Sequence, residues 1–214
     1  MDLSQYIDHT ALGPSTSEND VDRLCDEALR FGFHAICIPP HHIRFAAQRL
    51  ADTDIKIVTV AGFPYGYSAT PAKVEEIKRA LEEGAHELDV VVNLAAVRSG
   101  QWNYVEADID RMVTAVHLKG KAVKIIVETG LSTPAELDKL CAICNKQGVD
   151  YVKTSTGVNG DGVSVEAVRY LRGKLKKGIK IKASGGIRDA AFARELIQAG
   201  ADRLGTSSGP KLVR

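Results

Sequence analysis

The chain has 214 residues, of which 44% are apolar and 26% are charged, a composition typical of a globular protein with a substantial core. Its 28 lysine and arginine residues nearly balance its 27 acidic residues, so the charge favours neither nucleic acid nor an anionic membrane as a partner. No stretch approaches the ~20 apolar residues of a membrane span and no basic-then-apolar signal opens the chain, so we expect a cytoplasmic protein with a single domain over residues 1–214.

Eight short apolar runs alternate with helical patterns along the chain. Strands are predicted at residues 6–10, 35–38, 56–60, 87–92, 123–127, 151–154, 179–183 and 203–205. Near-continuous apolar strands separated by helices favour a parallel sheet that is buried on both faces.

The helices between these strands begin and end at recognisable signals. Thr133-Pro134-Ala135-Glu136 has the spacing of a capping box, and Thr70 is predicted to cap the helix that Pro71 opens. Helices are predicted at about 15–32, 40–50, 70–84, around 109–116, and at 133–148, 164–172 and 188–199. Eight such units of about 27 residues favour an α/β fold, a single (β/α)8 TIM barrel with parallel strands and a short N-terminal segment. A doubly wound open sheet is the alternative.

Cysteine and histidine pairs in the sequence could suggest a metal site. Cys141 and Cys144 form a C-x-x-C, but they lie inside a helical pattern without a second ligand pair, so we expect them to pack in the core. His41 and His42 are adjacent and cannot converge on one ion, so we expect solvated surface residues. We therefore predict no metal site and no cofactor.

Charged residues interrupt the apolar strands near their carboxyl ends, where the active site of a TIM barrel lies. These residues include Asp8, Asp89, Lys153 and Lys182. Lys153 and Lys182 are on neighbouring strands, and two inward ammonium groups roughly 6 Å apart repel by about 3 kcal/mol at an effective dielectric constant of about 20. We therefore expect this pair to supply a neutral amine for attack on a carbonyl group. Lys180 is predicted at the opposite, solvent-facing rim.

Two glycine-rich loops follow the last two strands, Ser184-Gly185-Gly186 and Gly205-Thr206-Ser207-Ser208-Gly209. Glycines let backbone N–H groups approach an anion, and a helix beginning near Arg188 adds its positive end. Barrels of this type often bind phosphate at these two loops. A phosphate site is therefore predicted here, with ordinary βα turns as the alternative.

Seven motifs run in order along nearly the whole chain. They are Ile7-Asp8-His9-Thr10, Gly62-Phe63-Pro64, Glu87-Leu88-Asp89-Val90-Val91-Val92-Asn93, Glu128-Thr129-Gly130, Lys153-Thr154-Ser155-Thr156-Gly157, Lys182-Ala183-Ser184-Gly185-Gly186-Ile187-Arg188 and Gly205-Thr206-Ser207-Ser208. In these motifs the chain resembles the deoxyribose-phosphate aldolases, class I enzymes that form a Schiff base. The resemblance implies reversible cleavage of 2-deoxy-D-ribose 5-phosphate into acetaldehyde and D-glyceraldehyde 3-phosphate, in deoxyribose phosphate catabolism.

The resemblance also implies roles for individual residues. Lys153 would form the Schiff base, with Asp89 and Lys182 as proton donor and acceptor. The residues implied for binding the substrate and its phosphate are Asp8, Gly157, Gly185, Gly186, Gly205, Ser207 and Ser208. The implied partner is a phosphosugar, and the implied assembly is a homo-oligomer, a dimer or a tetramer.

Two departures from the family pattern accompany these motifs. Val158 stands where some relatives have a basic or aromatic contact, and the sequence ends at Arg214 without the C-terminal tyrosine of longer members. The alternative functions are another Schiff-base phosphosugar lyase, a barrel protein that binds pyridoxal phosphate, a phosphosugar isomerase that uses carboxylates, and a non-catalytic phosphosugar sensor.

Overall fold

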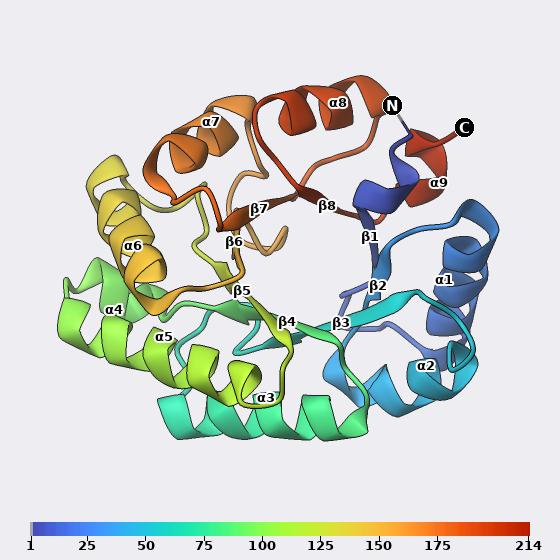
Figure 1. Cartoon of the computed structure of the whole chain (residues 1–214), viewed down its shortest axis with the longest axis horizontal. Coiled ribbons are helices and arrows are strands. Elements are labelled where there is room, and N and C mark those ends of the chain that lie inside the picture. The colour runs from blue at the N-terminus through green and yellow to red at the C-terminus, as the bar shows by residue number, and fades with distance from the viewer. Residues whose placement is uncertain (1) are drawn as a thin grey trace.

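The computed structural model describes residues 2–214 and shows eight parallel strands closed into a barrel (Figure 1). The strands are β1 (Ile7–Thr10), β2 (Ala35–Cys37), β3 (Lys56–Ala61), β4 (Glu87–Val91), β5 (Ala122–Ile126), β6 (Tyr151–Lys153), β7 (Lys180–Ser184) and β8 (Arg203–Thr206). Because β8 pairs with β1 through Asp8 and Gly205, the sheet has no free edge. The TIM-barrel prediction is confirmed, and the open-sheet alternative is excluded.

Helices form a ring around this barrel (Figure 1). They are α1 (Glu18–Phe31), α2 (Ile43–Arg49), α3 (Thr70–Glu83), α4 (Leu94–Arg98), α5 (Trp102–His117), α6 (Pro134–Gln147), α7 (Val165–Lys174), α8 (Ala190–Gln198) and α9 (Gly209–Leu212), with single 3-10 turns at Ser4–Tyr6 and Pro40–His42. The sequence did not predict α4 or α9. Both are shorter than two turns, so neither presents enough residues for a period of 3.6 to be visible.

One of the two helix caps that the sequence indicated is present. The capping box of α6 is present, since Thr133 Oγ1 accepts from Glu136 N and the Glu136 carboxylate accepts from Thr133 N. Thr70 is different. It is the first residue of α3, Ala69 is the N-cap, and the Thr70 hydroxyl donates to Asp108 of α5 over 2.7 Å. The prediction of a Thr70 cap was therefore wrong, because the hydroxyl is used between two helices.

The cysteine prediction is confirmed and the histidine prediction is wrong in part. Cys141 and Cys144 are buried in the core, and burial raises the pKa of Cys141 to about 11. His42 is also buried, and its Nε2–H donates to the carbonyl oxygen of Thr16 over 2.9 Å. The sequence could not show this contact, because it joins loops that are far apart along the chain.

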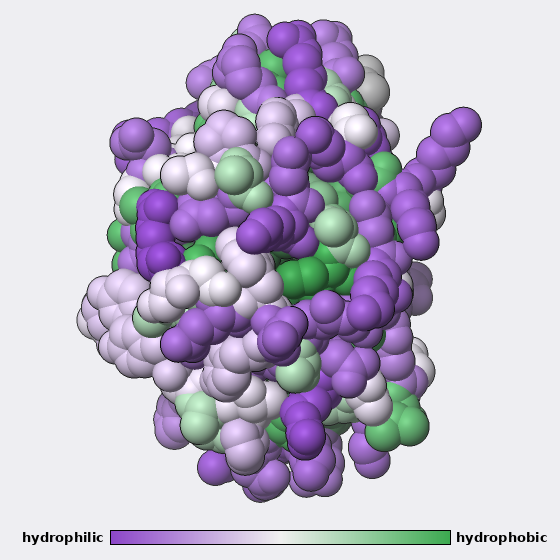
Figure 2. Space-filling model, turned by 90° about the vertical axis from the view of Figure 1, so that its left-hand side faces the viewer, coloured by the Kyte–Doolittle hydropathy of each residue, from purple (hydrophilic) through white to green (hydrophobic). Residues whose placement is uncertain are grey.

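The face of the molecule that carries α6 is mostly polar. On the side of the barrel that carries α6, Figure 2 shows hydrophilic residues with small, separate apolar patches. Among residues 2–214, no helix is both long and apolar enough to cross a membrane.

Candidate active site

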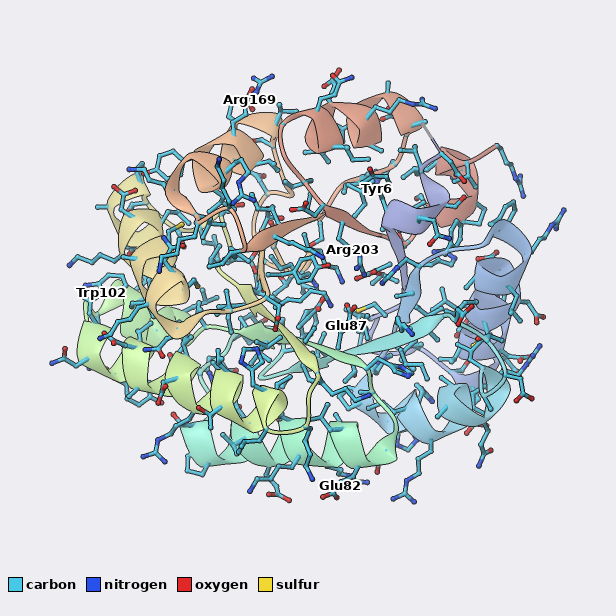
Figure 3. All side chains as sticks on the ribbon, viewed as in Figure 1. Tyr6, Glu82, Glu87, Trp102, Arg169 and Arg203 are labelled. Atoms are coloured by element: carbon cyan, nitrogen blue, oxygen red, sulfur yellow. The ribbon has the colours of Figure 1, made fainter. Side chains whose placement is uncertain are left out.

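Seven charged side chains fill the interior of the barrel, where apolar side chains usually pack. They are Asp8 of β1, Glu87 and Asp89 of β4, Lys124 of β5, Lys153 of β6, Lys182 of β7 and Arg203 of β8. Glu87 and Arg203, at the start of their strands, both point into the barrel (Figure 3). Each of these residues is at most 9% exposed, so each charged group requires a partner of opposite charge.

Asp89 lies at the centre of this network. Its Oδ2 is 2.8 Å from Lys153 Nζ and 2.8 Å from Lys182 Nζ, and its Oδ1 is 2.9 Å from Lys124 Nζ. Burial alone would raise the pKa of Asp89, but the three ammonium groups hold it well below its ordinary value. Asp89 is therefore an ionised carboxylate in direct contact with the ammonium groups of Lys124, Lys153 and Lys182.

Lys182 is held by two carboxylates, with Asp8 Oδ2 at 2.5 Å and Asp89 Oδ2 at 2.8 Å. Burial lowers its pKa, but these carboxylates more than offset this effect, so the pKa lies above its ordinary value. The sequence placed Lys182 correctly beside Lys153, its register partner on β6. The expectation of unopposed repulsion between the two lysines was wrong, because Asp89 lies between their ammonium groups.

Three residues of the network, Glu87, Lys124 and Arg203, were missed by the sequence analysis. Lys124 is 2.6 Å from Glu87 Oε2, and Arg203 is 2.9 Å from Asp8 Oδ1 and 3.5 Å from Glu87 Oε2. A usable signal was present, since Lys124 interrupts the apolar strand Ala122–Ile126 and Glu87 is on the same face of β4 as Asp89.

A cavity of about 740 Å³ opens at the carboxyl ends of the strands. Its wall is formed by residues 9–16, Asp20, Arg23, Leu24, Glu27, Lys153, residues 156–158, 184–188 and 205–207. Lys153 therefore reaches the cavity, whereas Asp89 and Lys182 are fully buried behind it. Lys180 is exposed at the start of β7, as predicted.

The residues predicted to bind substrate fall into two groups. Gly157, Gly185, Gly186, Gly205 and Ser207 line the cavity. Asp8 and Ser208 do not. Asp8 is fully buried between Lys182 and Arg203, and the backbone N–H of Ser208 donates to Thr206 Oγ1 over 2.9 Å.

The lack of a side chain has a different consequence at Gly186 and at Gly205. A Cβ on Gly186 would meet no atom within 4 Å, so its backbone is open to an approaching anion. A Cβ on Gly205 would lie 2.9 Å from Ser184 Cβ and 3.1 Å from Lys182 Cε. Gly205 therefore makes room for the side chain of Lys182 in addition to lining the cavity.

Comparisons with known proteins agree with this geometry. The family model described as "DeoC/LacD family aldolase" matches residues 3–211. A deoxyribose-phosphate aldolase of Thermococcus gammatolerans is 44% identical over 100% of this chain and 96% of its own length, and one of Desulfitobacterium hafniense is 45% identical over 100% and 98%.

Among solved structures, the deoxyribose phosphate aldolase from Aeropyrum pernix, described as having a unique tetrameric structure, superposes with a TM-score of 0.92 at 35% identity. The match covers 99% of this chain and 89% of that one. A structure described as "QR15, an Aldolase" gives a TM-score of 0.94 at 38% identity, over 100% and 95% of the two chains. The chain belongs to the DeoC/LacD aldolase family.

Proposed function

We propose that this enzyme reversibly cleaves 2-deoxy-D-ribose 5-phosphate into acetaldehyde and D-glyceraldehyde 3-phosphate through a Schiff base on Lys153. One observation carries the proposal. Of the four cations inside the barrel, Lys153 alone lines the cavity, and the glycine and serine loops line the same cavity. A primary amine facing a carbonyl and a phosphate cradle in one cavity suits an aldehyde that carries a phosphate.

The reaction proceeds by covalent catalysis at C1 of the open-chain sugar. Lys153 Nζ bonds to C1, and loss of water gives a protonated imine. The hydroxyl on C3 then gives up its proton, the C2–C3 bond breaks, and its electron pair moves toward the iminium to form an enamine. D-glyceraldehyde 3-phosphate leaves, a proton adds to C2, and water releases acetaldehyde and the free lysine.

In this reaction one group must accept a proton and another must donate one, and Asp89 and Lys182 suit these two roles. Three lysines hold the pKa of Asp89 below its ordinary value, against the effect of burial, so Asp89 is ionised and can accept a proton. Asp8 and Asp89 raise the pKa of Lys182, against the effect of burial, so Lys182 is charged and carries a proton that it can donate. Asp89 Oδ2 bridges the two lysines, at 2.8 Å from Lys153 Nζ and 2.8 Å from Lys182 Nζ, so a proton on Lys182 can reach Lys153 through this oxygen.

We further propose that the phosphate binds at the loops after β6, β7 and β8, through Gly157, Gly185, Gly186 and Ser207, with Gly205 beside them. Asp8 and Ser208 were predicted to bind substrate, but we propose structural roles for both. Asp8 holds Lys182 in its charged form, and Ser208 fixes the loop that carries Ser207.

The assay of cleavage couples acetaldehyde release to alcohol dehydrogenase and follows NADH. We expect acetaldehyde from 2-deoxyribose 5-phosphate, loss of at least about 1,000-fold in Lys153→Met, and little change in Lys180→Met, a matched lysine at the exposed start of β7. A ketose phosphate product would indicate an isomerase instead. A yellow purified protein would indicate pyridoxal phosphate, and preference for another phosphosugar would indicate a related lyase.

We also propose that residues 1–214 form one aldolase domain, that the chain forms a homo-oligomer, and that it acts in the cytoplasm. The tetramer described for the Aeropyrum pernix relative supports the assembly, and light scattering tests it. The free thiol state of all four cysteines is the state expected in a reducing compartment.

A further inference from the structure

Glu128 is a buried carboxylate for which the proposed reaction has no use. It lies just beyond β5 and is completely buried. Its φ is +51°, which makes it the one residue other than glycine with a positive φ in the described range 2–214. An L-amino acid adopts this conformation at a cost, so its surroundings must hold it there.

The carboxylate of Glu128 accepts hydrogen bonds from the neighbouring βα loop, residues 154–164 between β6 and α7. Thr156 donates its hydroxyl to Oε2 over 2.7 Å and its backbone N–H over 3.2 Å. The side-chain amide of Asn159 donates to the same oxygen over 3.4 Å and to the carbonyl oxygen of Pro64 over 2.8 Å. Glu128 thus joins the loops that follow β5, β6 and β3.

Thr156, which Glu128 holds in place, in turn binds the backbone of Val158 and Asn159. Its Oγ1 accepts from Val158 N over 3.1 Å and from Asn159 N over 3.2 Å. The backbone N–H groups of residues 156, 158 and 159 are therefore satisfied. The backbone N–H of Gly157, by contrast, has no hydrogen-bond partner within residues 2–214. Gly157 has a φ of +80° and lines the cavity.

We propose that Glu128 is a positioning residue that fixes the loop after β6 so that the Gly157 N–H faces the phosphate of the substrate. The inference rests on the proposed function, and it extends that function to a residue outside the cavity wall. Glu128 acts through Thr156 and touches neither substrate nor Lys153.

Both oxygens of Glu128 accept hydrogen bonds, Oε2 from Thr156 and Asn159 and Oε1 from Thr156 N over 3.3 Å, which is the arrangement that an ionised carboxylate makes. Burial raises the pKa of Glu128 above its ordinary value, although the hydrogen bonds from Thr156 and Asn159 and the charge of Lys153 act in the opposite direction. A substitution that keeps the shape but removes the charge should therefore weaken this restraint.

Glu128→Gln makes that change. The amide nitrogen that replaces one carboxylate oxygen would face the donors of Thr156 or Asn159, so the loop should lose its fixed geometry. We expect KM for 2-deoxyribose 5-phosphate to rise about tenfold or more, since the lost interaction includes charge-assisted hydrogen bonds. We expect kcat/KM for unphosphorylated 2-deoxyribose, and the rate of imine formation with acetaldehyde, to stay within threefold.

Glu136→Gln is the matched control. Glu136 also accepts the backbone N–H and the hydroxyl of a threonine, Thr133, but it does so at the start of α6, away from the cavity. Its KM should stay at the wild-type value. Equal losses on phosphorylated and unphosphorylated sugars in Glu128→Gln, or no change in either, would overturn the inference. If Glu128→Gln does not fold, Asn159→Ala should give the same selective effect with a smaller magnitude.

Amide hydrogen exchange tests the inference without relying on activity. In Glu128→Gln the amides of residues 156, 158 and 159 should exchange about tenfold faster than in the wild type. Inorganic phosphate should slow the Gly157 amide in the wild type and in Glu136→Gln, but not in Glu128→Gln. If the wild type fails to cleave the sugar phosphate but the exchange results are as expected, the proposed function is contradicted and the role of Glu128 in fixing the loop is not. Unchanged exchange in Glu128→Gln would overturn the role of Glu128.

Discussion

Lys153 differs from the other three cations inside the barrel in the number of carboxylates that it contacts. Lys124, Lys182 and Arg203 each contact two, whereas Lys153 contacts Asp89 alone. A bond from Lys153 Nζ to a carbonyl carbon would therefore disturb one ion pair, whereas the same bond at Lys124 or Lys182 would disturb two. These contacts favour Lys153 as the nucleophile.

Asp89→Asn should cause two separate losses. Turnover should fall by at least about 100-fold, because acid–base help is worth about 10²–10⁴-fold. The free energy of unfolding should fall by about 3–5 kcal/mol, because three buried ammonium groups lose a shared partner. Steady-state kinetics measures the first loss and urea unfolding measures the second.

A double variant separates these two roles of Asp89. Lys124 is one of the three cations that contact Asp89, and adding Lys124→Met returns the net charge of the network to its wild-type value, so the double variant should regain part of the lost stability. Its turnover should remain as low as that of Asp89→Asn. Recovery of turnover together with stability would mean that the carboxylate serves only the fold.

The two serines after β8 offer a test of the phosphate site. Ser207 lines the cavity and Ser208 does not, so a negative charge at residue 207 should repel the phosphate more strongly. We expect Ser207→Asp to raise KM for the phosphorylated sugar at least about tenfold, and Ser208→Asp to raise it less. Neither should alter imine formation with acetaldehyde. The opposite order would move the phosphate to the other side of this loop.

The candidate reactive residues could be identified from the sequence, but their charge states could not. Lys153, Asp89 and Lys182 stood out because each interrupts an apolar strand. Their ionisation depends on contacts that cross the barrel, such as that between Lys182 of β7 and Asp8 of β1. Lys124 interrupts a strand in the same way but lies outside the quoted motifs, and it was missed for that reason.

At the scale of the elements, close approach of strands and loops depends on glycine. Gly205 of β8 leaves space for the side chain of Lys182, its neighbour on β7. Gly162 lies against the β7–α8 loop, where a Cβ would come within 2.4 Å of the Gly185 carbonyl oxygen. The loops that carry the proposed phosphate site are thus packed against one another.

Gly205→Ala should displace Lys182 and disturb the network. We expect a loss of about 1–3 kcal/mol in the free energy of unfolding, as for other overpacked sites, and at least a tenfold loss of kcat. Gly173→Ala in α7 is the matched control, because its Cβ meets no atom within 4 Å. It should gain about 0.5–1 kcal/mol from helix propensity without altering kcat. Similar effects of both substitutions would contradict the packing role of Gly205.

Regular elements were predictable because their signals are local. The threonine and glutamate that cap α6 are three residues apart, and the helix they open was predicted within one residue of its start. Thr70 shows the limit of such signals. Its hydroxyl contacts Asp108, 38 residues away, and nothing in the local sequence distinguishes that use from a cap.

At the scale of the whole molecule, the interior network determines how stability responds to pH. Burial would raise the pKa values of Asp8 and Asp89, but the cations hold both below their ordinary values. Their stabilisation is complete above the unfolded pKa of about 4 and is lost as pH falls through the lower folded values. Lys182 has a raised pKa despite burial, so its contribution is complete below about pH 10 and is lost as pH rises through the folded value.

We therefore expect the network to contribute a constant amount to stability between about pH 5 and 10. The quantity to measure is the difference in unfolding free energy between the wild type and Asp89→Asn/Lys124→Met, because this difference cancels titration of surface histidines. The difference should be flat across this range and should shrink outside it. A change centred near neutral pH would contradict the ionisation states assigned to these residues.

The closed barrel was predictable from the regular alternation of its eight apolar strands with helices. What could not be predicted is which side chains from non-adjacent strands meet across the interior of the barrel. Lys153 pairs in register with Lys182, and Lys182 with Arg203. Only the folded barrel shows that Lys153 and Lys182 meet Asp89 from β4, while Arg203 meets Asp8 from β1. Four of the seven charged residues inside the barrel, Asp8, Asp89, Lys153 and Lys182, were therefore accessible from sequence, while the other three and the electrostatics of the site required the structure.

The most direct test of the account is to trap the Schiff base. The protein is incubated with acetaldehyde, reduced with borohydride, digested and analysed by mass spectrometry. The account predicts one ethyl group per chain, located on Lys153, with Lys124 and Lys182 unmodified because each is fully buried and held by two carboxylates. An adduct on Lys182 or Lys124, or no adduct in a protein that cleaves the sugar phosphate, would contradict it.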